Sequence, residues 1–201
     1  MPSLLTHPAV PLAVAAIAGR DLIPRPLLAA GIGFALLPDV DGVAFLLDIP
    51  WYSPFSHRGL THSFAFALLC ALLALPLAPK LGADRLRVFA FLALCMLSHG
   101  FLDACTDRGG GVALLWPLDS ARISFDFRPI QTVPISLERL FSAEGSRVIK
   151  SELLWVWLPL SSLALLGRGL RAAFPHRWSA IQAALLRHSV RGRPAEAAAD
   201  S

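Results

Sequence analysis

The chain has 201 residues and a mass of 21.6 kDa, which is enough for one compact domain. Hydrophobic residues make up 55% of it, charged residues only 16%, and the mean hydropathy is +0.60, so an average soluble composition and disorder are both excluded. The net charge of +4 does not indicate a nucleic-acid partner, because the arginines lie at the ends of apolar segments and not on a basic face with aromatic residues. The composition indicates an integral membrane protein.

Five apolar segments are expected to cross the bilayer as helices, which predicts an all-α, polytopic membrane bundle. The third and fourth are long enough to span a bilayer, the first two are shorter, and Pro159 interrupts the fifth. In chain order, the segments are Pro8 to Gly19, Pro26 to Leu37, Ser63 to Pro79, Leu86 to Cys105 and Leu153 to Leu166.

The basic residues predict how these segments are oriented. The connections between the first and second and between the third and fourth segments, together with the tail, hold 11 of the 18 lysines and arginines. Because such residues mark the cytoplasmic side, we expect a multi-pass protein of a bacterial inner membrane. Residues 106–152 then form a polar extracytoplasmic loop region, and residues 168–201 form a basic cytoplasmic tail.

Two shorter patterns lie in the polar loop region. Residues 135–150 predict a short amphipathic helix with Ser136 as its N-cap. Residues 122–128 alternate as a short strand would. The tail after residue 168 is basic and aromatic, which is typical of a helix that lies on a membrane surface.

The predicted topology brings most of the metal-competent side chains to the extracytoplasmic face. Four of the six histidines lie at helix ends that meet there. His99 and Asp103 are one helical turn apart, so they project from the same side of their helix, and Asp107 continues this row if the helix persists. Ionisable groups at the end of an apolar helix are costly unless they are paired, hydrated or bound to an ion. A structural His–Asp pair is the alternative to a ligand pair.

Two carboxylates, Asp39 and Asp41, follow the second segment at alternate positions. Alternate residues of an extended segment point the same way. Two close carboxylates repel each other unless a cation lies between them or one is protonated. The alternative is a polar helix end with a turn at Gly42.

The sequence from Ser56 to Ser63, SHRGLTHS, is the densest cluster of polar motifs. His57 and His62 flank a glycine-containing turn, and the second histidine leads into an apolar helix whose free N–H groups favour an anion. Arg58 can hold a phosphate or carboxylate through two parallel hydrogen bonds. The pattern favours an anionic ester as ligand, whereas a headgroup anchor at Arg58 and interfacial histidines are the alternative.

His7 precedes the first apolar segment, and the topology delivers it to the same face. Imidazole and carboxylate ligands together suit zinc, manganese or iron, and the candidates exceed the needs of one tetrahedral zinc ion. A site for two or more divalent metal ions is therefore expected. Such sites stabilise both the attacking and the leaving oxygen of a displacement.

These motifs resemble the YdjM-like, LexA-regulated family of membrane-bound metal-dependent hydrolases. The similarity extends over residues 6–117, and its most specific element is HRGLTHS at residues 57–63. Gly42 is a departure, because we expect many family members to have histidine after the second aspartate. In chain order, the matching motifs are Thr6-His7, Leu37 to Asp41, His57 to Ser63, Ser98 to Asp103 with Thr106, and Gly111 to Pro117.

The resemblance implies a helical membrane protein with metal-dependent hydrolase activity, similar at a distance to zinc-dependent phospholipases C and related single-strand nucleases. The membrane-embedded hydrolase domain is then expected over residues 1–167, with Asp41 as a possible additional ligand. The metal ligands that the resemblance implies are His7, Asp39, His57, His62, His99 and Asp103.

The leading hypothesis is hydrolysis of a phosphoester in a phospholipid or lipid-linked phosphate by metal-activated water. A metal ion lowers the pKa of a bound water to roughly 7, and Asp41 or Asp107 would take its proton. Arg58 would hold the phosphoryl group. A non-enzymatic metal-binding or metal-transport protein is the rival hypothesis, and it predicts ligands on both sides of the membrane midplane. The third is a structural protein whose polar cluster is only a hydrogen-bond network.

Overall fold

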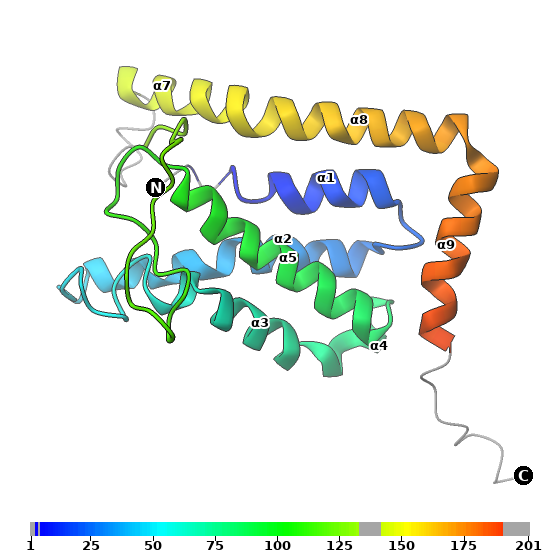
Figure 1. The fold of residues 1–201 in the computed structure, drawn as a ribbon, viewed down its shortest axis with the longest axis horizontal. Helices are drawn as coiled ribbons and strands as arrows, with labels where there is room; N and C mark the ends of the chain where they lie inside the picture. The colour runs from blue at the N-terminus through cyan, green and yellow to red at the C-terminus, as the bar shows by residue number, and fades with distance from the viewer. Residues whose placement is uncertain (1–2, 4, 133–141, 191–201) are drawn as a thin grey trace, which may run out of the picture.

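The computed structural model describes residues 3, 5–132 and 142–190. Within these residues the protein is all-helical, with two isolated β-bridges and no strand (Figure 1). The expected all-α bundle of about five apolar helices is confirmed. Those five helices are α1 (Ala9–Ala18), α2 (Arg25–Leu36), α3 (Phe64–Leu73), α5 (Arg85–Ala104) and α8 (Leu158–Ala173).

Helices α1, α2 and α8 run along the long axis of the molecule, α3 and α5 slope across it, and the five alternate in direction along the chain (Figure 1). Helix α5 packs against α2 and α3, while α1 lies between α2 and α8. Where α2 meets α5, Gly31 permits the close approach, because a Cβ at this position would lie 2.4 Å from the Phe91 ring.

In the part of the chain that the structure describes, four helical stretches are long and apolar enough to cross a membrane, whereas α1, with ten residues, is shorter. The α3 stretch continues through the 3₁₀ turn η3 (Leu75–Leu77) into α4 (Ala78–Leu81). The four stretches are Arg25–Phe45, Phe64–Leu81, Arg85–Ala104 and Ala143–Ala173.

The second stretch is longer than the sequence pattern predicted. After α2 the chain continues as a 3₁₀ helix, η1 (Leu37–Phe45), that carries both Asp39 and Asp41. The expectation of an extended segment here is therefore wrong. Pro38 does not end the helical course, because it stands in the first turn of η1, where its missing N–H group costs no hydrogen bond.

The last stretch is also longer, because Pro159 does not interrupt it. A π-helical turn, η4 (Leu153–Trp157), joins α7 (Ala143–Glu152) to α8, so that Pro159 falls in the first turn of α8. Ser142 caps α7 through the amides of residues 144 and 145. The predicted cap Ser136 lies outside the described residues.

Instead of the short strand expected at residues 122–128, the structure has one antiparallel bridge between Val112 and Ile123.

Capping side chains begin two of the central helices. Ser63 accepts a hydrogen bond from the Phe66 amide at the start of α3, and Asp84 accepts one from the Arg87 amide at the start of α5. The core between α2, α4 and α5 is packed with leucine, alanine, valine and phenylalanine side chains. Leucines on α3 and α8 are exposed, as expected for surfaces that face lipid.

The two ends of the bundle differ in character. At one end, helix α9 (Pro175–Val190) crosses the bundle (Figure 1), and the Arg171 guanidinium lies 5.9 Å from the centroid of the Trp178 ring. The connections α1–α2 and α4–α5 lie at the same end. At the opposite end lie η1, the 3₁₀ turn η2 (Leu60–His62), the polar loops and α7. The predicted convergence of four helix ends is therefore confirmed.

Candidate metal centre

Six predicted ligands meet at the end of the bundle opposite α9, and we call them, together with Asp41, the His/Asp cluster. They come from the segment before α1, from η1, from the η2 region and from the last turn and a half of α5. All are shielded: side-chain exposure is 0% for four of the predicted ligands, 5% for Asp39 and 9% for His57. The members are His7, Asp39, Asp41, His57, His62, His99 and Asp103.

One group of four side chains is arranged as a ligand set. One nitrogen or oxygen atom from each of Asp39, His62, His99 and Asp103 lies within 4.8 Å of the others. The Nε2 atom of His62 is 3.3 Å from Oδ2 of Asp103, and Nε2 of His99 is 3.6 Å from Oδ1 of Asp39. Two imidazoles and two carboxylates suit zinc and related divalent ions.

His7 completes this group from outside the helices. Its ring stacks on His99, with ring centroids 3.7 Å apart and an interplanar angle of 16°. Its Nε2 atom lies 3.8 Å from Oδ2 of Asp39 and 4.0 Å from Oδ1 of Asp103. Burial lowers the pKa of His7 to about 4 against the attraction of Asp103, so the ring is neutral at pH 7 and keeps a lone pair for a metal.

Many buried polar atoms of the cluster have no hydrogen-bond partner, although buried polar groups in proteins nearly always have one. Carboxylate oxygens and imidazole nitrogens of this kind are stabilised by a cation that lies among them. The donor set therefore fits a metal centre. Among the described residues, the atoms without a partner are both ring nitrogens of His7, both carboxylate oxygens of Asp39, Oδ1 of Asp103 and Nε2 of His57, whereas Oδ2 of Asp103 lies 3.1 Å from Nε of Arg58.

Hydrogen bonds fix the rings of His62 and His99 so that Nε2 faces the group. Nδ1 of His99 lies 2.7 Å from the Ala35 carbonyl oxygen, which only accepts, so Nδ1 carries the proton. Thr61 donates its hydroxyl proton to Asp41 and therefore accepts from Nδ1 of His62 at 3.1 Å. In both rings Nδ1 therefore holds its proton toward another partner, and Nε2 is the atom left for a metal, as metal-binding histidines require.

Asp41 accepts hydrogen bonds from three donors. His57 Nδ1 lies 2.6 Å from its Oδ1 atom, and the Arg58 amide and the Thr61 hydroxyl donate to Oδ2. Asp41, His57 and His62 form a second group whose atoms could hold a cation. The 3₁₀ course of η1 separates Asp41 from Asp39, so the two carboxylates serve different groups.

Arg58 is buried, with 2% exposure, and lies beneath the loop that follows α5. Its Nε atom is 3.1 Å from Oδ2 of Asp103, and Nη1 donates to the Thr106 hydroxyl and the Arg108 carbonyl oxygen. A Cβ at Gly109 would lie 2.3 Å from Nη1, so only glycine leaves room for the guanidinium. Nη2 has no hydrogen-bond partner among the described residues and is the donor left for an anion.

The structure does not bring Asp107 to the cluster. Helix α5 ends at Ala104 and the chain turns away, so Asp107 does not continue the row of His99 and Asp103 as expected. Asp107 accepts hydrogen bonds from the amide and the hydroxyl of Thr132. It lines a separate polar cavity of about 140 Å³ with residues of the polar loop region and α7.

Two contacts that support the site were not predicted. Glu152, which is 3% exposed, accepts hydrogen bonds from the amide and the hydroxyl of Ser3, and this ties the segment that carries His7 to the end of α7. In the sequence, the only feature that points to this contact is the position of Glu152 as a single acid directly before an apolar segment. Arg122 donates to the carbonyl oxygens of Trp51 and His57 and so braces the loop before η2.

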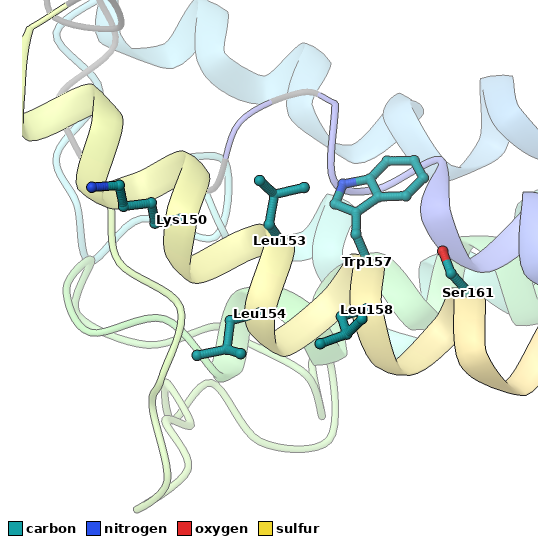
Figure 2. Close-up of a pocket in the computed structure, with 6 residues that line it drawn as sticks. All are labelled: Lys150, Leu153, Leu154, Trp157, Leu158 and Ser161. Atoms are coloured by element: carbon teal, nitrogen blue, oxygen red, sulfur yellow. The ribbon is translucent and has the colours of Figure 1, made fainter.

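Two apolar grooves lie on the membrane-spanning part of the protein, and neither is lined by a histidine or an acid. One of about 640 Å³ lies between α3, α5 and the start of α8. The other, of about 450 Å³, runs along one side of α7, η4 and α8 (Figure 2). Metal-binding chemistry is therefore confined, among the described cavities and clusters, to the end of the bundle that holds η1 and η2.

Comparison with known proteins gives two matches. A profile of the YdjM inner membrane protein family matches residues 1–174. The chain is also 41% identical over 160 residues to the inner membrane protein YbcI of Escherichia coli (strain K12), and the aligned region covers 79% of this chain and 92% of that protein. No solved structure is significantly similar to the chain.

Proposed function

Because this chain belongs to the YdjM family of inner membrane proteins, as the sequence motifs suggested, we propose that it is a metal-dependent hydrolase of membrane lipids. The reaction is cleavage of a phosphoester in a phospholipid or lipid-linked phosphate, on the extracytoplasmic side of the inner membrane. One observation carries the proposal: buried imidazole nitrogens and carboxylate oxygens without hydrogen-bond partners converge from four separate segments.

The proposed site holds two or more divalent ions, with zinc as the first candidate. One ion would be bound by Asp39, His62, His99 and Asp103. His7 lies close enough to this set to be an additional ligand. Beside this set, in the group of Asp41, His57 and His62, the unpartnered Nε2 atom of His57 would bind a second ion, because the one lone pair of a neutral His62 ring is used by the first. Bound metal supplies Lewis acidity and lowers the pKa of a coordinated water.

The surrounding side chains have distinct tasks in this proposal. Nη2 of Arg58 is the unpartnered donor that would hold a phosphoryl oxygen, while Nε of the same side chain neutralises Asp103. Asp41 is the carboxylate that would take up a proton at the outer edge of the cluster. Its 2.6 Å contact with Nδ1 of His57 stabilises its charge. Asp107, in its separate cavity, has no part in the reaction.

The position of the site favours a lipid substrate over a transported ion. The His/Asp cluster lies at one end of the bundle, and the core that fills the rest of the described bundle consists of apolar side chains such as Leu27, Val88 and Leu92. A transport pathway needs polar side chains across the midplane. A substrate that never leaves the bilayer, in contrast, can reach a site at the ends of the membrane helices.

The test is a screen of the purified, metal-loaded protein against phospholipids and polyprenyl phosphates, with identification of the product by mass. We expect release of a phosphorylated headgroup or of inorganic phosphate, with the turnover abolished in His62→Ala and His99→Ala. His176→Ala, an exposed histidine on α9, is the matched control and should retain it. Stoichiometric metal without turnover of any substrate would instead favour the metal carrier.

A further inference from the structure

A hydrophobic loop projects from the end of the bundle that holds the His/Asp cluster. We call residues 43–55 the apolar loop; Asp48 is its only charged residue. Seven of its large apolar side chains are 50–83% exposed. An exposed apolar patch of this kind marks a contact with a membrane or a protein. The exposed side chains are Val43, Phe45, Leu46, Leu47, Trp51, Tyr52 and Phe55.

The loop is held in place by hydrogen bonds and by Arg122. The amides of Leu46 and Leu47 donate to the Val43 carbonyl oxygen. Nη2 of Arg122 donates to the Trp51 carbonyl oxygen at 2.6 Å, and the guanidinium lies 5.8 Å from the centroid of the Trp51 ring. The apolar side chains are therefore presented outward by a braced backbone.

The loop stands beside the outer edge of the His/Asp cluster. His57, Asp39 and Asp41 are the members whose side chains retain some exposure, so access from outside is at their edge. The Phe45 ring lies 5.2 Å from the His57 ring. Anything that the apolar loop contacts is therefore close to the entrance of the site.

We propose that the apolar loop inserts into the interfacial region of the bilayer leaflet at this end of the bundle. The loop begins within the last three residues of the membrane stretch Arg25–Phe45, so lipid is the medium in which it begins. Tryptophan and tyrosine, here Trp51 and Tyr52, are the residues that favour the membrane interface. Turns of irregular backbone are tolerated there but not in exposed contact with the hydrocarbon interior.

The consequence for the site rests on the proposed function. A loop embedded beside His57 makes the lipid interface, and not bulk water, the medium at the entrance. The substrate would then be a lipid with an anionic phosphate headgroup that enters sideways from the same leaflet. Water-soluble phosphoesters would reach the site without any contribution from the loop.

A spin label at Leu46 in proteoliposomes tests the insertion. Leu46→Cys is prepared with Cys70 and Cys105 replaced by alanine, while Cys95 stays because it is fully buried. The label should be accessible to oxygen, which concentrates in lipid, and protected from a water-soluble nickel complex. Leu72→Cys on α3 is the lipid-exposed control, and Asp119→Cys in the polar loop region is the water-exposed control.

Two results would overturn the proposal. One is accessibility to the nickel complex equal to that at Asp119, which would place the loop in water. The other is protection from both reagents together with spin–spin broadening between labels, which would identify a second copy of this chain as the partner. If the triple variant does not fold, the tryptophan fluorescence of the wild type and of Trp51→Phe is quenched with brominated lipids. Insertion predicts that lipids brominated near the headgroup quench the wild type more than Trp51→Phe. Equal quenching of the two proteins contradicts insertion.

A kinetic experiment separates this inference from the proposed function. Leu46→Asp should raise the KM for a long-chain lipid phosphate in vesicles roughly tenfold, because the apolar burial of one leucine is lost. The same variant should leave turnover of a short-chain, water-soluble phosphoester unchanged. If the wild type hydrolyses neither substrate, the proposed function fails while the spin-label result still decides the insertion. Equal KM values for wild type and variant would contradict lateral entry.

Discussion

The Nε2 atoms of His62 and His99 lie 3.0 Å apart and point at each other. Both Nδ1 atoms use their protons on other partners, so two neutral rings would oppose two lone pairs at this distance. Such an arrangement is stable only with a proton or a cation between the rings. Burial lowers the pKa of His62, but hydrogen bonds to Asp103 and Asp41 outweigh it and raise that pKa to about 9. In the metal-free protein a proton therefore takes the place that we propose for a metal.

Asp41→Asn should weaken metal binding without removing a ligand of the first group. The carboxylate orients His57 and His62, and loss of a partner of this kind typically lowers metal affinity roughly 10–100-fold. Zinc affinity is measured by competition with a chromophoric chelator. Asp48→Asn, on the exposed apolar loop, is the matched control and should bind zinc as the wild type does. Equal affinities of the two variants would remove Asp41 from the site.

Arg58→Ala should destabilise the metal-free protein strongly, because it leaves the buried Asp103 carboxylate without its cationic partner. Removing one partner of a buried ion pair typically costs about 3–5 kcal/mol. The free energy of unfolding is measured by chemical denaturation in detergent micelles. Arg58→Lys keeps the charge and should lose less, and Arg108→Ala, whose side chain is 77% exposed, should lose almost nothing. A loss in Arg58→Ala no larger than in Arg108→Ala would show that the pair is unimportant for stability.

Glu152→Ala should loosen the segment that carries His7. The glutamate accepts two hydrogen bonds from Ser3, so its removal should speed amide hydrogen exchange in residues 5–7 and lower metal affinity. Glu144→Ala, an exposed acid on the same helix, serves as the control. Unchanged exchange in residues 5–7 would mean that other contacts hold His7 in place.

Asp84→Ala should lower the free energy of unfolding by about 1 kcal/mol, because it removes the N-cap of α5. Asp84→Ser keeps a capping oxygen and should lose less. Burial raises the pKa of Asp84, but hydrogen bonds from Arg87 outweigh it, so the pKa lies below its usual value. The carboxylate therefore stabilises the fold at neutral pH, and this contribution disappears as the pH falls through the lowered pKa. Denaturation of wild type and Asp84→Ala should converge at acid pH, and a constant difference would contradict this account.

The sequence was sufficient to predict which helix ends meet, because apolar segments and basic residues alternate along the chain. It also predicted the His99–Asp103 pair, because an i, i+4 spacing on a helix puts both side chains on one side. The proposal that His7 belongs to the site could follow from topology alone. In the structure its ring stacks on His99, 92 positions away along the chain.

The remaining features depend on contacts that no local pattern encodes. Asp39 and Asp41 were expected to point the same way, but a 3₁₀ helix assigns them to different groups. Arg58 lies within the HRGLTHS motif and was expected to hold substrate. In the structure most N–H donors of its guanidinium contact Asp103 and the loop after α5. The contact of Glu152 with Ser3 joins positions 149 residues apart, so it is invisible in a linear reading.

Metal content measured together with lipid phosphoester hydrolysis tests the central claim most directly. Wild-type protein purified from metal-replete cells should retain at least one divalent ion per chain and release phosphate or a phosphorylated headgroup from lipid. His99→Ala should lose both the metal and the hydrolysis, while His176→Ala should keep both. A folded wild-type protein that binds no divalent ion even after incubation with zinc, or a His99→Ala variant that hydrolyses lipid at the wild-type rate, would contradict the account.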